Sequence, residues 1–290
     1  LLYRLRQKGL VESSQVPPYE EEAIQVLQRV LANVKVKDPK SQLVASEQVA
    51  TKDPYAIEAK KISYQYEEME EEYALNEASL NVREGEMLAL LGENGAGKTT
   101  LAKMFNGILK PTSGEVLIHG ENTKGKDVEE LSSVVGYCYQ NPDHQLFTGT
   151  VYDDVAYGPR NMGLSKKEVD KRVSDTLKMV GLYDKKEDYP FLMSRGDRQV
   201  IAVASVVAMG VDILVVDEPT TGMDLNGTRM IMDLITEWNK RGTTVIVITH
   251  DVYLVADYVP RTVLLSNGKV LADGPTKSIF KDQNAMKMTY

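Results

Sequence analysis

The chain has 290 residues, and its 42 acidic side chains outnumber its 34 Lys and Arg, giving a net charge of −8 that argues against a protein coating nucleic acid. Its most apolar stretch, residues 200–211, is shorter than the about 20 residues that cross a bilayer, and the single cysteine, Cys138, allows no intrachain disulfide and favours a reducing compartment. Composition therefore excludes an integral membrane protein, a disulfide scaffold and a nucleic-acid-coating protein, but it leaves open a protein that works beside a membrane.

Residues 1–54 are predicted to form a leading segment that precedes the main domain, residues 55–290. Pro17–Pro18 and the acids Glu20–Glu22 stand before apolar residues at helical spacing, which predicts an amphipathic helix. Residues 35–54 are polar, contain two prolines and are typical of a linker. The helix is expected to pack on the main domain or on a neighbour, and the alternative is a docking element.

From Ala56 onward the pattern becomes one of strands, turns and helices. Apolar runs without polar alternation, separated by amphipathic helices, are typical of a mostly parallel sheet covered on both faces, and they predict an α/β fold. The acidic run 67–73 is expected to be a solvated hairpin turn rather than a metal site. The predicted strands are Met87–Leu91, Glu115–His119, Val134–Tyr139, Ile213–Val216, Thr244–Thr249, 262–266 and 269–272, and the predicted helices are Thr99–Leu109, Lys166–Val180, Arg198–Met209 and Thr228–Lys240.

A glycine-rich loop follows the strand Met87–Leu91 and opens a helix. Residues 92–99 match G-x-x-x-x-G-K-[ST], the loop whose backbone N–H groups turn inward around phosphates while the helix N-terminus adds partial positive charge. Lys98 can reach the terminal phosphates, and the Thr99 hydroxyl can bind Mg²⁺. The alternative is a glycine-rich turn with no ligand. The nucleotide-binding residues expected in and beside this loop are Asn94, Gly95, Ala96, Gly97, Lys98, Thr99 and Thr100.

Two acids follow the apolar strand Ile213–Val216. An acid at the carboxyl end of a parallel strand lies at the edge where ligands bind, so Asp217 is expected to hold Mg²⁺ and Glu218 to polarise the attacking water. The alternative is that this pair only caps a helix. A GTPase is disfavoured, because the only string like a guanine-reading motif, residues 51–54, lies upstream of the loop with the wrong spacing.

These motifs together resemble those of the ABC-type ATPases over about residues 56–285. The run 216–224 resembles the family's acidic strand end and the loop after it, and Ser194–Ala204 lies where the signature helix should start. Thr249–Asp251 matches the switch histidine, and Tyr139–Pro142 matches the Q-loop. The resemblance implies a P-loop NTPase fold with a mostly parallel core sheet, an antiparallel β subdomain and a helical signature subdomain, and it implies ATP and Mg²⁺ as cofactors.

The resemblance also assigns roles to single residues. Tyr66 would stack on adenine, Gln140 would link the Mg²⁺ and water site to a transmembrane partner, and His250 would bond the γ-phosphate and help to hold Glu218. Ser194 and Gly196 would touch the γ-phosphate in the site of a second cassette. The implied catalytic residues are Glu218, His250 and Gln140, the implied metal ligands are Thr99, Gln140 and Asp217, and His119 and His144 are left as structural.

The signature departs from the family's usual Leu-Ser-Gly-Gly-Gln. This chain has Met-Ser-Arg-Gly-Asp at residues 193–197, so Arg195 replaces a small residue and Asp197 replaces a neutral amide near an anion. Arg195 is expected to offset the acid by pairing or by reaching the phosphate itself. The change puts the partner's site in doubt, and it favours an asymmetric dimer if the two cassettes differ.

Two stretches between the glycine-rich loop and the signature resemble the energy-coupling-factor subfamily, which comprises the cobalt, nickel and vitamin importers. These are Gln140–Phe147 and Val151–Pro159. The resemblance implies a motor that is peripheral on the cytoplasmic face of the membrane. It would pair with a second cassette and bind a transmembrane coupling subunit, without touching the transported substrate or nucleic acid. Residues 1–19 resemble the tail that follows a cassette in this group, which favours the second half of a tandem protein over an unrelated extension.

Two other functions stay open at this point. One is a soluble ABC ATPase acting in translation, which the charge of −8 disfavours. The other is a non-hydrolysing nucleotide-dependent regulator, which the intact Glu218 and His250 disfavour.

Overall fold

The computed structural model describes residues 55–66 and 73–281. The chain divides into two units, Leu1–Thr51 and Lys52–Tyr290, and every described residue belongs to the second. The predicted leading helix and linker lie outside the described residues, as does the predicted turn except for its last residue. Within the described ranges, no helix has the length and apolar character that a membrane crossing requires.

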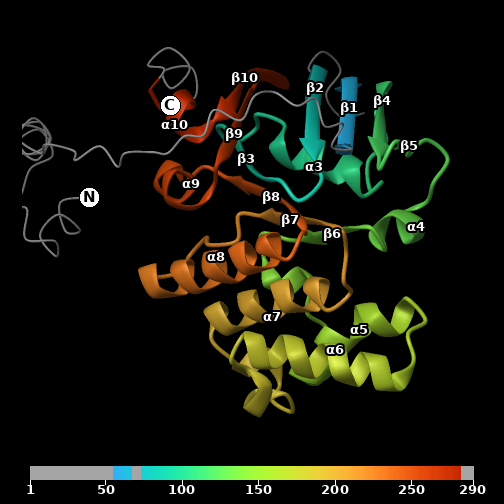
Figure 1. Ribbon diagram of the computed structural model, residues 1–290, viewed down its shortest axis with the longest axis vertical. Helices are drawn as coiled ribbons and strands as arrows, with labels where there is room; N and C mark the ends of the chain where they lie inside the picture. Colours follow the sequence, from blue (N-terminus) through green and yellow to red (C-terminus); the bar gives the residue numbers. More distant parts are fainter. Residues whose placement is uncertain (1–54, 67–72, 282–290) are drawn as a thin grey trace, which may run out of the picture. The chain divides into compact units, whose positions relative to one another are not determined.

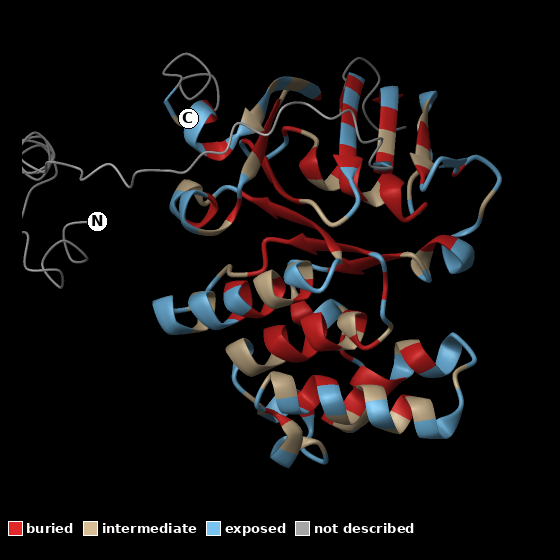
Figure 2. Cartoon of the chain, viewed as in Figure 1, coloured by how far each residue is buried: buried red, intermediate tan, exposed pale blue. Residues whose placement is uncertain are grey.

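The centre of the fold is a six-stranded sheet in the order β10-β9-β3-β8-β7-β6 (Figure 1). Five strands run parallel and β10 is antiparallel to its neighbour β9. Its central strands β3, β8 and β7 are buried along their whole length (Figure 2), and their parallel pairing confirms the mostly parallel sheet that the unbroken apolar runs predict. The strands are β3 (Met87–Leu91), β6 (Val135–Cys138), β7 (Ile213–Asp217), β8 (Thr244–Thr249), β9 (Arg261–Ser266) and β10 (Lys269–Pro275).

A second, antiparallel sheet covers one side of the molecule in the order β2-β1-β4-β5. Helix α3 (Lys98–Phe105) lies between the two sheets (Figure 1), where Leu101, Met104 and Phe105 join both sheets in one apolar core. This arrangement confirms the antiparallel subdomain that the family resemblance implies. The strands are β1 (Tyr55–Tyr64), β2 (Leu75–Arg83), β4 (Ser113–Ile118) and β5 (Glu121–Asn122).

Helices cover the other face of the central sheet (Figure 1) and enclose a second apolar core around Val155, Val173, Ile201 and Ile235. They are α5 (Val151–Asn161), α6 (Lys166–Met179), α7 (Arg195–Val207) and α8 (Leu225–Lys240). The described residues also form three short α-helices, α4 (Val128–Ser132), α9 (Val252–Tyr258) and α10 (Thr276–Ile279), and three 3-10 helices, η2 (Pro142–His144), η3 (Tyr183–Lys185) and η4 (Pro190–Leu192).

Strand register decides which side chains meet at the end of β7. Alternate residues of a strand point to opposite faces, so Val215 and Asp217 share the face toward α3 while Val216 faces the helical core. Tyr137 on β6 stands opposite Val215 in the parallel ladder. Tyr137 and Asp217 therefore lie on the same face of the sheet, near its carboxyl edge.

The helix ends differ from the predicted ones for local reasons. Helix α3 ends at Phe105 rather than at Leu109, because Asn106 caps it and Gly107 turns left-handed with φ +75°. Helix α7 begins at Arg195 rather than at Arg198, because the Ser194 side chain accepts a hydrogen bond from the backbone N–H of Asp197 at 3.1 Å.

Candidate nucleotide-binding site

A cleft of about 680 Å³ opens where β3, β7 and β8 end. It collects the glycine-rich loop, both acids and the histidine, which lie far apart in the sequence. The expected site residues that line it are Tyr66, Asn94, Gly95, Ala96, Gly97, Lys98, Thr99, Thr100, Gln140, Asp217, Glu218 and His250. Tyr73, Ala74, Asn76 and Asn267 also line it and were not predicted.

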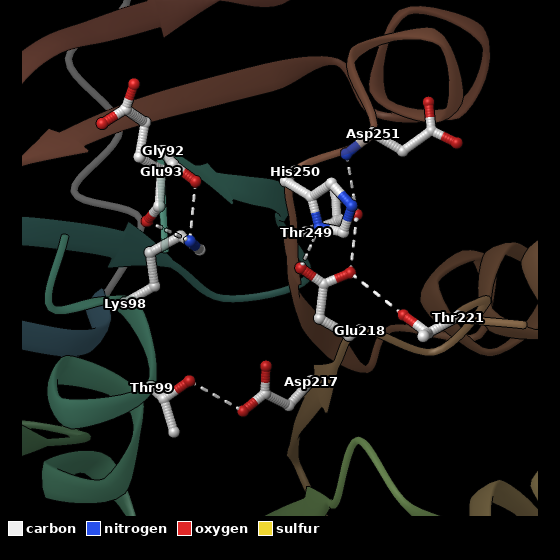
Figure 3. A network of polar contacts seen from close by, with 10 residues as sticks. All are labelled: Gly92, Glu93, Lys98, Thr99, Asp217, Glu218, Thr221, Thr249, His250 and Asp251. Carbon is white, nitrogen blue, oxygen red and sulfur yellow. Dashed lines mark hydrogen bonds and ion pairs between the residues drawn. The ribbon is translucent and has the colours of Figure 1, made fainter. Parts of the chain in front are cut away.

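The glycine-rich loop packs tightly against the chain and holds the lysine that follows it. Gly97 has φ +98°, and a Cβ there would lie 2.4 Å from the Ala74 carbonyl oxygen, so no other residue fits. The Lys98 ammonium folds back and donates to the carbonyl oxygens of Gly92 at 2.6 Å and Glu93 at 2.8 Å (Figure 3). Burial lowers the pKa of Lys98 below its usual value, while the charges of Glu218 and Asp217 oppose that shift.

Asp217 is held by two hydroxyl donors on one oxygen. The Thr99 hydroxyl donates to Asp217 Oδ2 at 3.0 Å (Figure 3), and the Tyr137 hydroxyl donates to the same oxygen at 2.6 Å. Burial, together with the neighbouring Asp217 charge, raises the pKa of Tyr137, so its phenol stays protonated and remains a donor. The contact with Tyr137 was not predicted from the sequence.

Glu218 is fixed from several sides although its own backbone is unusual. It has φ +46°, which is uncommon for a residue with a Cβ, and its N–H donates to the Ile248 carbonyl at 2.8 Å. His250 Nδ1 lies 2.7 Å from Glu218 Oε1, and the hydroxyls of Thr249 and Thr221 each donate to Oε2 at 3.4 Å (Figure 3). An ionised carboxylate only accepts, so the Nδ1 of His250 is the donor in this pair.

The oxygen atoms in the cleft fit a magnesium ion. Thr99, Gln140 and Asp217 offer a hydroxyl, an amide oxygen and a carboxylate. Mg²⁺ prefers oxygen ligands, and proteins usually bind it through one or two carboxylates together with the phosphates of a substrate. Across residues 55–66 and 73–281, no group of three or more His, Cys, Asp or Glu could hold an ion by itself. The donor set therefore fits an ion that is bound together with a phosphate rather than in a protein cage.

Tyr66 stands at the edge of the same cleft. Its hydroxyl lies 3.1 Å from the Thr100 hydroxyl, and its ring meets Tyr64 edge-on with centroids 4.9 Å apart. Tyr66 is 36% exposed and lines the cleft. The adenine contact that the family resemblance implies for it stays a prediction.

The signature segment does not line this cleft. Ser194 and Gly196 lie at the start of α7, and the Arg195 guanidinium lies against Gly222, where a Cβ would approach Arg195 Nη1 to 3.2 Å. The cation beside Asp197 is Lys185, whose Nζ lies 3.5 Å from Asp197 Oδ2. Residues 194–197 therefore contact Lys185 and Gly222 and lie outside the cleft that contains Lys98.

Comparison with known families matches residues 75–221 to the ABC transporter family. A putative ABC transporter ATP-binding protein of Caldanaerobacter subterraneus is 39% identical over 279 residues, which are 95% of this chain and 48% of that protein. The chain thus spans about half the length of this relative. The energy-coupling factor transporter ATP-binding protein EcfA of Methanocaldococcus jannaschii is 43% identical over 80% of this chain and 84% of its own length.

Solved structures with the same fold include two informative neighbours. One is cbiO1 from Clostridium perfringens, described as part of the ABC transporter complex cbiONQ, with TM-score 0.73 and 35% identity over 81% of this chain and 94% of that one. The other is the ATP-binding cassette MJ0796, a dimer in a post-hydrolysis state bound to ADP and Pi, with TM-score 0.69 and 30% identity over 76% and 98%.

Proposed function

Because the chain belongs to the ABC transporter family of ATP-binding ATPases, we propose that it is the ATP-hydrolysing motor subunit of an importer of the energy-coupling-factor type. The observation that carries the proposal is the held carboxylate of Glu218, which His250 contacts at 2.7 Å in the cleft that also contains Lys98. A carboxylate fixed in this way beside a phosphate loop is suited to act on a water molecule. EcfA and cbiO1, the latter part of cbiONQ, support the transporter type.

The predicted residues of the cleft divide the reaction among them. Tyr66 stacks on the base, the loop N–H groups and Lys98 bind the phosphates, and Thr99, Gln140 and Asp217 hold Mg²⁺. An ion held by these three residues would supply positive charge against the charge that develops on the phosphate oxygens. Glu218 accepts a proton from the attacking water or orients it, while the His250 N–H keeps the Glu218 carboxylate aimed at that water.

The motor works as a pair of cassettes. Ser194 and Gly196 lie away from the chain's own cleft and complete the site of a second cassette, which is why the segment carries no contact to Lys98. The dimer of MJ0796 supports this arrangement. The partner is a second cassette of the same or another kind, or the other half of a tandem protein, which the half-length match to the Caldanaerobacter relative favours.

An exposed aromatic pair that follows Gln140 in the chain is the proposed contact for the transmembrane coupling subunit. Phe147 is 61% exposed, Tyr157 is 47% exposed, and their rings meet edge-on at 4.7 Å. Adjacent exposed rings on a described surface are suited to receive an apolar helix. The chain would then lie on the cytoplasmic face of the membrane, and the transported metal ion or vitamin would meet only membrane subunits.

The direct test is ATP turnover of Glu218→Gln. The amide keeps the shape of the side chain but cannot take a proton, so turnover should fall at least about a hundredfold while ATP still binds. Glu84→Gln is the matched control, because Glu84 pairs with His119 outside the cleft. Full turnover of Glu218→Gln would show that Glu218 is not catalytic. The turnover would then come from another residue of the chain or from a contaminating ATPase.

A second experiment separates transport from a role in translation. Affinity purification of the tagged chain from detergent-solubilised membranes should recover a membrane subunit, and Phe147→Asp with Tyr157→Asp should lose it while keeping ATP binding. Recovery of ribosomes instead would favour the translation alternative, against the net charge of −8.

A further inference from the structure

We infer that Tyr137 is a positioning residue of the ATPase site, where its hydroxyl holds the Asp217 carboxylate in the orientation that binds Mg²⁺. This inference rests on the proposed function, because it names a further residue of the same site. It concerns a side chain that stands outside the loop, acid and histidine motifs and that is not among the residues lining the cleft.

The geometry begins with the sheet. Tyr137 stands opposite Val215 in the parallel β6–β7 ladder, and Asp217 follows Val215 on the same face. The Tyr137 ring therefore packs on the face toward α3, and only its hydroxyl reaches the carboxyl edge of the sheet. Tyr137 is 8% exposed and Asp217 is 6% exposed, so water cannot easily replace this hydrogen bond.

The hydrogen bond is selective for one oxygen. Both Tyr137 and Thr99 donate to Asp217 Oδ2, at 2.6 Å and 3.0 Å. Thr99 is itself an expected ligand of the ion, whereas Tyr137 is not, so Tyr137 acts on the ion only through Asp217. A donor behind a ligating carboxylate fixes its rotation and compensates its burial, and losing such a partner weakens metal binding.

A purely structural role makes a different prediction. If Tyr137 only filled the core between β6 and α3, phenylalanine would replace it without consequence, because the ring packing is retained and one oxygen is removed. A positioning role predicts that the same oxygen sets the Mg²⁺ requirement. Tyr137→Phe therefore separates the two roles within a fold that stays packed.

The experiment measures the Mg²⁺ concentration at half-maximal ATP-dependent thermal stabilisation of the full chain, in the Glu218→Gln background where ATP is not consumed. Tyr137→Phe should raise this midpoint about tenfold, while ATP affinity measured in EDTA stays within about twofold. The control is Tyr152→Phe, which removes a hydroxyl that likewise donates to a carboxylate, that of Asp170, outside the cleft. It should leave the Mg²⁺ midpoint unchanged.

A double-mutant cycle then identifies the route. In an Asp217→Ala background, Tyr137→Phe should cause no further change in the Mg²⁺ midpoint, because the residue it acts through is gone. An unchanged midpoint for Tyr137→Phe alone, or an equal shift for Tyr152→Phe, would overturn the inference. If the wild-type chain did not hydrolyse ATP although the Glu218→Gln variant binds Mg²⁺ and ATP, the proposed function would be contradicted instead. The Mg²⁺ midpoints would still decide the role of Tyr137.

Discussion

Two regions of this chain carry motifs for the same reaction, yet they are built in opposite ways. The cleft around Lys98 draws side chains from three strand ends into contact, with Glu218 and His250 2.7 Å apart. The signature segment at the start of α7 is organised by its own cap and by the exposed Lys185–Asp197 pair, and Ser194 and Gly196 do not line the cleft. The chain thus assembles one cleft from its own residues, whereas the signature segment lies outside that cleft, where the proposed function assigns it to the site of a second cassette.

The largest effect is expected where the cleft meets the phosphates. Lys98→Met keeps the aliphatic stem but removes the buried ammonium beside Gly92 and Glu93, so turnover should fall about a thousandfold, measured by phosphate release. Lys240→Met, at the exposed end of α8, is the matched control. Turnover within tenfold of wild type for Lys98→Met would mean that the loop does not bind the reacting phosphates.

The next effect concerns the contact between β7 and β8. His250→Ala removes the donor at Glu218 Oε1, so turnover should fall about a hundredfold while ATP affinity changes little. His119→Ala serves as control, since His119 pairs with Glu84 and Asp212 away from the cleft. Equal losses of turnover in His250→Ala and His119→Ala would mean that His250 has only a structural role.

A smaller effect is expected in the other region. Arg195→Gly together with Asp197→Gln restores the family pattern. This double variant should raise the turnover of an assembled complex about threefold, because it removes an acid near the phosphates bound by the second cassette. ATP binding by the single chain should stay the same, since neither residue lines its cleft. An unchanged turnover in the complex would make the altered signature a neutral variant.

Sequence reasoning worked best where chemistry demands fixed spacing. The loop that leads into α3 and the acids at the carboxyl end of β7 were predicted from residue types and their order, because phosphate binding needs glycines next to a lysine and metal binding needs an acid at a strand end. The positions of Gln140 and His250 came from the family resemblance rather than from spacing. Both line the cleft together with the acids.

The missed features depend on pairing between distant segments. Tyr137 reads as an ordinary core residue, and only the β6–β7 register places its hydroxyl at Asp217. Helix α5 was not predicted either, and Gly158 and Pro159, two poor helix formers, fall in its last turn. The pairing of Asp197 with Lys185, rather than with Arg195, also depends on how α7 meets the preceding loop.

Gly196→Asp separates the two regions, through its effect on ATP binding by the single chain and on turnover of the complex. A Cβ at Gly196 would meet nothing closer than Met223 Cε at 3.5 Å, and an acid in the first turn of α7 suits the helix dipole, so the helix is expected to form in the variant. The account predicts wild-type ATP affinity in the single chain and turnover reduced at least about twofold in the assembled complex, because the acid faces the partner's phosphates. A weakened ATP affinity of the single chain, or undiminished turnover of the complex, would contradict it.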